Sequence, residues 1–131
     1  MAVCAYLPVA IATFFGCPDE TISGFVDTAV AYRLTTIDGA AFEASATINF
    51  QGQGDASGEG PCNRWSAEQR VPYPWFELGP IAATKRACAD LEAEATFFQA
   101  LGEMSLAEVS GTFLILSNDD GREMVFEAQT P

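Results

Sequence analysis

Four cysteines and 18 acidic residues are the side chains of this 131-residue chain that could carry chemistry, and histidine is absent from the sequence. Histidine is the commonest general base, the commonest transition-metal ligand and the usual partner of a nucleophilic serine or cysteine. Its absence removes most hydrolase mechanisms, and no pair of carboxylates is singled out for acid and base work on sugars. We therefore expect a protein that acts by binding or by its presence, with an unrecognised enzyme as the least favoured alternative.

Two acidic clusters could suggest a metal site, and each has a simpler structural interpretation. Asp90, Glu92 and Glu94 stand where a helix would begin, and the helix dipole favours negative charge there. The run from Asn118 to Gly121 lacks the alternating oxygen ligands and distant glutamate of an EF-hand loop, so it favours a hairpin turn. A glycine-rich phosphate loop with its lysine is also missing. We expect no catalytic residues, no metal and no cofactor.

The first 17 residues contain no charged side chain, and Ala2 to Gly16 is apolar except for Thr13 and interrupted by Pro8. This stretch is short for a membrane span, which needs about 20 residues, and it suits the apolar region of a secretory signal. The residues before Cys17 resemble a bacterial lipobox, in which the cysteine is lipidated. We expect residues 1–17 to be a signal or lipoprotein segment; the alternative is a buried strand or helix over residues 3–15.

Cys62 and Cys88 would remain as a pair if Cys4 leaves with the signal and Cys17 carries lipid. In an oxidising compartment such a pair can form a disulfide. The alternative is two buried thiols packed as small hydrophobic groups.

Length and composition predict a single folded domain. The chain is 49% hydrophobic and 18% charged, which is far from the composition of a disordered chain. Residues 18–29 are polar and acidic and are predicted to be a tether, which leaves residues 30–131 as the domain. The formal net charge of -12 would repel nucleic acid, so neither DNA nor RNA is expected as a partner. We expect a monomer.

Hydrophobic periodicity predicts a β-rich fold. Residues 44–51 alternate between apolar and polar side chains, as a half-buried strand does. Residues 52–60 keep the period of two with glycine and alanine on one face, which is typical of a strongly curved sheet or, alternatively, of a flexible loop. Two further hairpins are predicted, at residues 32–37 with the Asp38-Gly39 turn, and at 113–116 with 124–126.

One segment has the period of a helix. The residues that share its predicted apolar face are Leu91, Ala95, Phe98 and Leu101. Asp90 can cap the start of this helix, and Gly102 can end it.

Aromatic residues concentrate around the prolines at positions 72 and 74. The candidate binding residues are Trp65, Tyr73, Trp75 and Phe76. They could form the lip of an apolar groove for a lipid or peptide. The alternative is a proline-bent edge whose aromatic rings fill the core.

These features, in this order, resemble a META domain, the HslJ-like group of bacterial envelope proteins, from about Tyr32 to Phe126. The run Cys62-Asn63-Arg64-Trp65 is similar to the family's Gly-Cys-Asn-x-aromatic signature, with Pro61 in place of the glycine. The run from Thr84 to Cys88 is similar to its Thr-Arg-x-x-Cys signature. The remaining matches are Glu94, Phe97, Phe98 and Leu101 in the family's helix, and Leu114, Leu116, Asp120, Gly121 and Phe126 in its final hairpin.

The resemblance implies a mainly β (α+β) fold, in which a curved antiparallel sheet forms an open or cracked β-barrel with one helix packed across it. We expect the signature residues Cys62, Asn63, Thr84 and Cys88 to be structural. Asn63 would hydrogen-bond neighbouring backbone in a turn, and Thr84 would bond backbone across the sheet. Lys85 and Arg86 are expected to pair with nearby acids.

The family is associated with stress response, secretion and envelope integrity, without an established reaction. We expect a periplasmic, lipid-anchored or secreted protein that binds an apolar ligand or an envelope protein and meets the membrane only through its N-terminal lipid. The alternative is a structural or stress-response envelope protein without a ligand.

Overall fold

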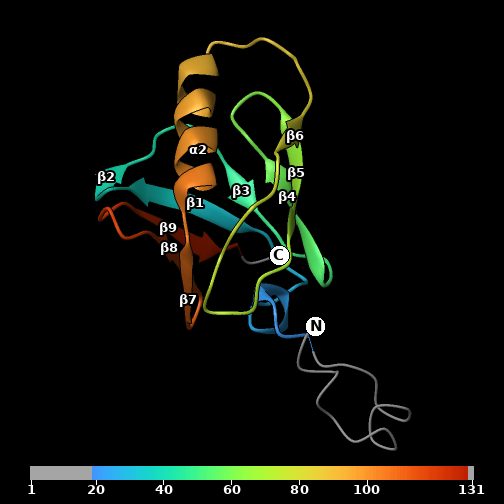
Figure 1. Ribbon diagram of the computed structural model, residues 1–131. Coiled ribbons are helices and arrows are strands. Elements are labelled where there is room, and N and C mark those ends of the chain that lie inside the picture. The colour runs from blue at the N-terminus through green and yellow to red at the C-terminus, as the bar shows by residue number, and fades with distance from the viewer. Residues whose placement is uncertain (1–18, 130–131) are drawn as a thin grey trace, which may run out of the picture.

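A computed structural model describes residues 19–129 of the chain, so the predicted signal segment and the lipidation of Cys17 lie outside the described residues. The fold is mainly β, with a single α-helix in the part of the chain that is described (Figure 1). The elements in chain order are η2 (Ile22–Gly24), β1 (Tyr32–Ile37), β2 (Ala40–Ala41), β3 (Thr47–Ile48), β4 (Gly54–Glu59), β5 (Arg64–Gln69), β6 (Ala82–Ala83), α2 (Leu91–Glu103), β7 (Leu106–Ser110), β8 (Phe113–Ser117) and β9 (Glu123–Ala128). Over residues 19–129, no helix is long and apolar enough to cross a membrane.

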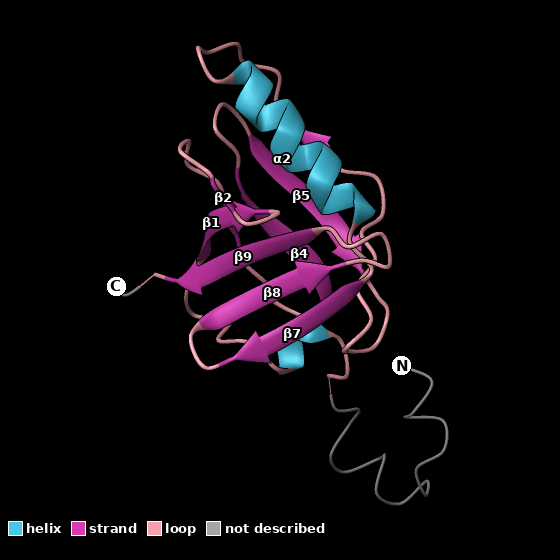
Figure 2. Ribbon diagram, turned by 90° about the vertical axis from the view of Figure 1, so that its left-hand side faces the viewer, coloured by secondary structure: helices cyan, strands magenta, loops and turns pink. Residues whose placement is uncertain are grey.

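The strands form two antiparallel sheets. The larger has the order β2-β1-β9-β8-β7, with β3 also paired to β1, and the smaller has the order β4-β5-β6. The two sheets meet on one side where Asn49 and Ser57 exchange backbone hydrogen bonds of 2.7 and 3.0 Å. On the other side, Trp75 forms an isolated bridge with Leu106 at the edge strand β7. The sheet is curved and does not close, which confirms the predicted open barrel with one helix packed across it (Figure 2).

Both predicted hairpins are present. The β1–β2 turn consists of Asp38 at φ 53° and Gly39 at φ 82°, and two left-handed residues in sequence make the turn type that matches the twist of the strands. Asp38 is held in this conformation by its side chain, which accepts hydrogen bonds from Arg122 and from the backbone N–H of Glu123. At the other hairpin, β8 and β9 pair in register from Phe113 opposite Glu127 to Ser117 opposite Glu123.

The glycine-rich stretch forms the strand β4, and β3 crosses it at close distance. A Cβ added at Gly58 would lie 2.1 Å from the carbonyl oxygen of Thr47, so only glycine fits this crossing of β3 and β4. The strand interpretation therefore holds for residues 54–59. Residues 44–51 contain only the short strand β3, but Ala46, Ile48 and Phe50 are buried, as the alternation predicted.

The helix α2 buries a face that differs from the predicted one. Its buried residues are Glu94, Phe97, Ala100 and Leu101, so Leu101 alone of the predicted apolar face is buried. Asp90 makes no side-chain capping bond, and the helix continues through Gly102 to Glu103. Asp90 thus stands at the predicted N-cap position without a capping bond from its side chain, and the prediction that Gly102 ends the helix was wrong by one residue. The face is set by packing against β5, where Trp65 meets the rings of Phe97 and Phe98 at 6.1 and 6.4 Å between centroids.

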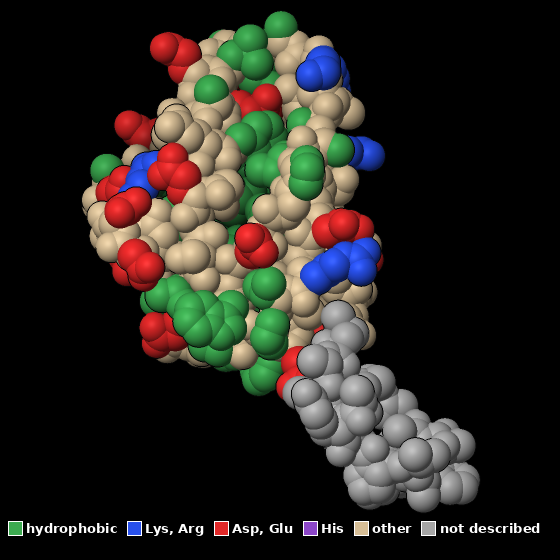
Figure 3. Space-filling model, in the orientation of Figure 1, with side chains coloured by type: hydrophobic (Ala, Val, Ile, Leu, Met, Phe, Trp, Pro, Cys, Tyr) green, Lys and Arg blue, Asp and Glu red, His purple; other side chains and the backbone are tan. Residues whose placement is uncertain are grey.

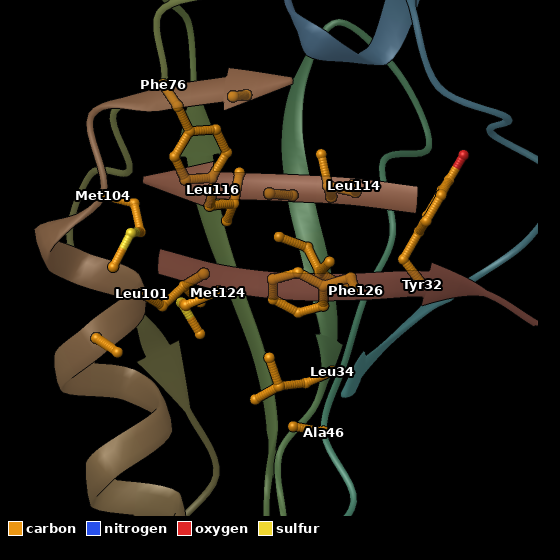
Figure 4. Close-up of a cluster of buried hydrophobic side chains, with 14 of the residues drawn as sticks. Tyr32, Leu34, Ala46, Phe76, Leu101, Met104, Leu114, Leu116, Met124 and Phe126 are labelled. Carbon is orange, nitrogen blue, oxygen red and sulfur yellow. The ribbon is translucent and has the colours of Figure 1, made fainter. Parts of the chain in front are cut away.

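The core fills the space between the larger sheet and α2 (Figure 4). Alternate residues of β1, β8 and β9 point into it, since successive side chains of a strand face opposite sides. Its fully buried large side chains include Tyr32, Leu34, Leu114, Leu116, Met124 and Phe126 from these strands, together with Leu101 from α2 and Phe76 from the connection after β5.

Residues 19–26 are part of the packed domain, so the tether predicted for residues 18–29 was wrong for this stretch. Ile22 is buried in the core. The backbone N–H of Tyr73 donates to the carbonyl oxygen of Glu20 at 2.7 Å. Asp19 accepts hydrogen bonds from the side chains of Thr21 and Ser23. The polar composition of this stretch favours a tether. Composition does not reveal, however, that a neighbouring carboxylate satisfies these hydroxyl groups and lets the stretch pack against the domain.

Candidate functional site

The two signature runs meet at a disulfide. Cys62 follows β4 and Cys88 precedes α2, and they are bonded with 5.7 Å between their Cα atoms. This is the pairing that the sequence analysis put forward as one of two hypotheses. The bond joins the β4–β5 turn to the chain that leads into the helix.

Asn63 is buried beside this disulfide and uses both ends of its amide. Its Nδ2 donates to the carbonyl oxygen of Arg86 at 3.0 Å and to Glu94 Oε1 at 2.7 Å. Its Oδ1 accepts from Thr84 Oγ1 at 2.9 Å and from the backbone N–H of Arg86 at 2.6 Å. Asn63 therefore bonds the backbone of Arg86, 23 residues away, whereas a bond to neighbouring backbone was expected. The hydroxyl of Thr84 bonds the side chain of Asn63, whereas a bond to backbone across the sheet was expected.

Glu94 completes this network, a role that was not predicted from the sequence. Its Oε2 accepts from the backbone N–H groups of Cys62 at 2.8 Å and of Asn63 at 2.7 Å. A Cβ added at Gly60 would lie 2.9 Å from the same oxygen, so glycine leaves room for the carboxylate. The available signal was spacing, because Glu94 stands three residues before Phe97 and so shares its helix face. Every side-chain polar atom of the network has a partner within it, so the signature residues spend their hydrogen bonds on holding the β4–β5 turn, residues 84–86 and α2 together.

The four candidate binding aromatics are not brought together. Trp65 and Phe76 are buried in the core, and Trp65 Nε1 donates to the carbonyl oxygen of Thr47 at 3.2 Å. Tyr73 is partly buried, while Trp75 keeps 57% of its surface exposed. The prediction of a common groove lip is therefore wrong for Trp65 and Phe76, because a domain of this size needs its large rings in the core.

An open groove of about 410 Å³ lies between α2 and residues 81–87, and we call it the α2 groove. Its apolar wall consists of Ile81, Ala83, Ala87, Leu91 and Phe98, and its polar wall of Asn63, Thr84, Lys85, Arg86 and Glu94. Figure 3 shows hydrophobic side chains along the seam between α2 and the smaller sheet, with basic side chains on the side of that sheet. The signature network thus forms one wall of the groove and fixes its shape.

Basic side chains gather at this groove without acidic partners. The ion pairs among residues 19–129 join Arg70 to Glu68, and Arg122 to Asp38 and Glu103. Lys85 and Arg86 are in none of them, so the expected pairing with nearby acids was wrong. Arg64 lines an adjoining hollow of about 320 Å³ that shares Thr84 and Arg86 with the groove. Three of the six cations of the chain therefore line the groove and the adjoining hollow, together with the carboxylates of Glu94 and Glu59.

Neither shifted pKa values nor clustered metal ligands indicate a second site among the described residues. The Arg122 guanidinium hydrogen-bonds Asp38 and lowers the pKa of that carboxyl, and Arg70 lowers the pKa of Glu68 in the same way. Both carboxyl groups belong to ion pairs on the surface of the domain, so their lowered pKa values do not indicate a functional site. Within residues 19–129, no group of three or more acidic or cysteine side chains is placed to hold a metal ion.

Comparison with known proteins gives a family and a fold. The family model described as the META domain matches residues 27–131. An NMR structure of a protein from Burkholderia xenovorans is similar to this chain with a TM-score of 0.67 and 22% identity, covering 88% of this chain and 93% of the other. A second NMR structure has a TM-score of 0.61 at 19% identity, covering 80% of this chain and 92% of the other.

A crystal structure of a DUF4847 family protein from Bacteroides vulgatus has a TM-score of 0.53 at 13% identity, with 66% of this chain and 60% of the other covered. At such identities these likenesses concern the fold alone. A search of curated proteins found no match.

Proposed function

Because this chain belongs to the META domain family, we propose that it is a non-catalytic binding protein of the bacterial cell envelope, attached to a membrane through Cys17. Its ligand is an amphiphile with an apolar chain and an anionic head, held in the α2 groove. The single observation that carries this proposal is the presence of an apolar wall and unpaired cations in the same groove of a strongly acidic protein.

The apolar chain of the ligand would lie along the wall formed by Ile81, Ala83 and Phe98. A volume of about 410 Å³ falls within the range of small-molecule sites. Each methylene group buried there contributes about 0.8 kcal/mol. The ring of Phe98 packs edge-to-face against the ring of Trp65, so this wall is already formed before a ligand binds.

The head of the ligand would lie at the end of the groove that carries Lys85 and Arg86. Charge-assisted hydrogen bonds from lysine and arginine to a carboxylate or phosphate are about twice as strong as neutral ones. The rest of the surface is acidic and repels anions, so these residues offer an anion the favourable approach. The expected ligand is therefore a long-chain acid in preference to a neutral molecule of the same length.

A structural envelope protein without a ligand is the second candidate. The observation that favours it is the Asn63–Glu94 network, in which the signature residues satisfy one another. In that case the groove is a by-product of placing a helix across an open barrel.

Binding of cis-parinaric acid, a fluorescent long-chain fatty acid, to the full chain separates the two candidates. We expect saturable binding of the acid and weaker binding of the matching alcohol. The double variant Lys85→Gln/Arg86→Gln should weaken binding of the acid about tenfold, which corresponds to about 1.4 kcal/mol, and leave the alcohol unaffected. Ile81→Asp should weaken both. Arg33→Gln is the matched control, because Arg33 is an exposed cation on β1, outside the groove.

Absence of saturable binding would favour the structural candidate. Equal loss of acid binding in the Arg33 control would mean that net charge, and not the groove, attracts the acid.

A further inference from the structure

Three aromatic side chains lie in segments that meet at one end of the domain: the stacked pair Phe25 and Tyr73, and Trp75, two residues after Tyr73. Phe25 is 51% exposed and Trp75 is 57% exposed, which makes them the two most exposed large hydrophobic side chains among residues 19–129. The ring of Phe25 stacks on that of Tyr73, with 4.4 Å between centroids and 18° between planes. We call Phe25, Tyr73 and Trp75 the aromatic patch. Figure 3 shows hydrophobic side chains gathered at the lower end of the face in view.

The backbone behind the patch is held firmly. Tyr73 donates its N–H to Glu20 at 2.7 Å, and its hydroxyl accepts from the N–H of Val109 at 2.9 Å. Pro74 accepts from the N–H of Ala107 at 2.8 Å, and Trp75 donates to Pro72 at 2.8 Å. These bonds tie the segment to the edge strand β7. The exposure of Trp75 is therefore a fixed feature of the surface and not the result of a loose loop.

The segment that precedes the domain joins it beside this patch. Glu20, whose carbonyl is bonded to Tyr73, is three residues from Cys17 and four from the apolar run that ends at Gly16. A chain spans at most about 3.6 Å per residue, so three residues reach no more than about 11 Å from Glu20. Whatever surface holds Cys17 is therefore brought to the patch as well. Figure 1 shows η2 and the bend between β5 and β6 at this lower end, with the start of α2 at the opposite end.

We propose that the aromatic patch rests on the interface of a lipid bilayer and so orients the domain on the membrane. Tryptophan and tyrosine concentrate at membrane interfaces, where the ring is in an apolar layer and its polar atom reaches water. The net charge of -12 favours a bilayer of neutral headgroups over an anionic one. The patch would be a second membrane contact, in addition to the proposed lipid anchor. It rests on the proposed membrane attachment, and it does not depend on a ligand in the α2 groove.

The test follows tryptophan fluorescence of the full chain on phosphatidylcholine vesicles whose acyl chains carry bromine, a contact quencher. In the variant Trp65→Phe, Trp75 is the sole tryptophan, and we expect vesicles to quench most of its emission and to shield it from aqueous acrylamide. In Trp75→Phe, the buried Trp65 should be unaffected. If Trp65→Phe does not fold, the difference between wild type and Trp75→Phe gives the same quantity.

A third variant places a probe at the opposite end. Glu92 is exposed in the first turn of α2 and does not line the α2 groove, so Glu92→Trp in the Trp65→Phe/Trp75→Phe background is a matched reporter. We expect it to remain open to acrylamide and unquenched by bromine. Equal quenching at positions 75 and 92 would overturn the orientation. Protein that floats with vesicles while Trp75 is unquenched would overturn the patch proposal alone, and protein that does not float at all would overturn membrane attachment as well.

Discussion

Replacing Glu94 by glutamine changes one oxygen of a buried carboxylate into an NH2 group and alters little in volume. The carboxylate accepts three hydrogen bonds, from the N–H groups of Cys62 and Asn63 and from Asn63 Nδ2. An amide has one oxygen to offer. In either orientation of the new side chain, its NH2 group faces at least one donor, and Asn63 cannot turn its own amide without losing both hydrogen bonds to the backbone of Arg86.

The expected cost follows from these contacts. In the better orientation one charge-assisted bond is lost, at about 1.5–3 kcal/mol, and the two remaining bonds lose their charge. We expect Glu94→Gln to lower the free energy of unfolding by roughly 3 kcal/mol in total. With a urea m-value of about 1.5 kcal/mol per molar, the unfolding midpoint should fall by about 2 M.

Glu92→Gln is the control for this measurement. Glu92 occupies the same first turn of α2 but is exposed, so its replacement removes only a helix-dipole interaction of about 0.3–1 kcal/mol. Urea unfolding of both variants, followed by circular dichroism, compares buried and exposed carboxylates in one helix. If the two midpoints agree within about 0.3 M, corresponding to about 0.5 kcal/mol, the hydrogen bonds of Glu94 do not stabilise the fold as argued.

Two further predictions concern glycine and pH. Gly58→Ala should destabilise the domain by at least about 2 kcal/mol, because its Cβ would meet the Thr47 carbonyl, whereas Gly102→Ala in the helix has open space and should stabilise it by up to about 1 kcal/mol. Thermal unfolding of both variants checks the opposite signs, and a shared sign would refute the assignment. Asp38→Asn should reduce stability at pH 7, since Arg122 lowers the pKa of Asp38 from its ordinary value of 3.8. That stabilisation is present above the ordinary value and is lost as pH falls through the lowered one, so wild type and variant should converge only in acid; a difference that stays constant from neutral pH down to about pH 2 would contradict this sign.

Local rules explain why much of the fold could be predicted. The Asp38-Gly39 turn, the alternation of Ala46, Ile48 and Phe50, and the two strands of the last hairpin each depend on residues within a few positions of one another. Turn chemistry and strand period act over such distances. The same logic locates the helix but not its buried face, because that face includes the acidic residue Glu94, which hydrophobic periodicity does not assign to an apolar face.

The candidate site was largely hidden from the sequence. Lys85 and Arg86 were expected to be neutralised, and Trp65 and Phe76 were expected to line a groove, because pairing and exposure depend on which elements come together. The α2 groove is formed by residues 81–87 and one side of the helix, which no periodicity connects. The resemblance to META domains identified the signature residues, and the structure supplied what they bond.

The sequence by itself determined the class of this protein: an acidic, histidine-free, mainly β domain with one helix and the META signatures. These features follow from composition and from short-range patterns, which are independent of how the chain closes. The tertiary structure alone decided that Glu94 is buried, since its partners stand 31 and 32 residues before it. It also decided that Lys85 and Arg86 line one groove with Arg64 in the adjoining hollow, and that Phe25 stacks on Tyr73, because such contacts are set by the packing of distant segments.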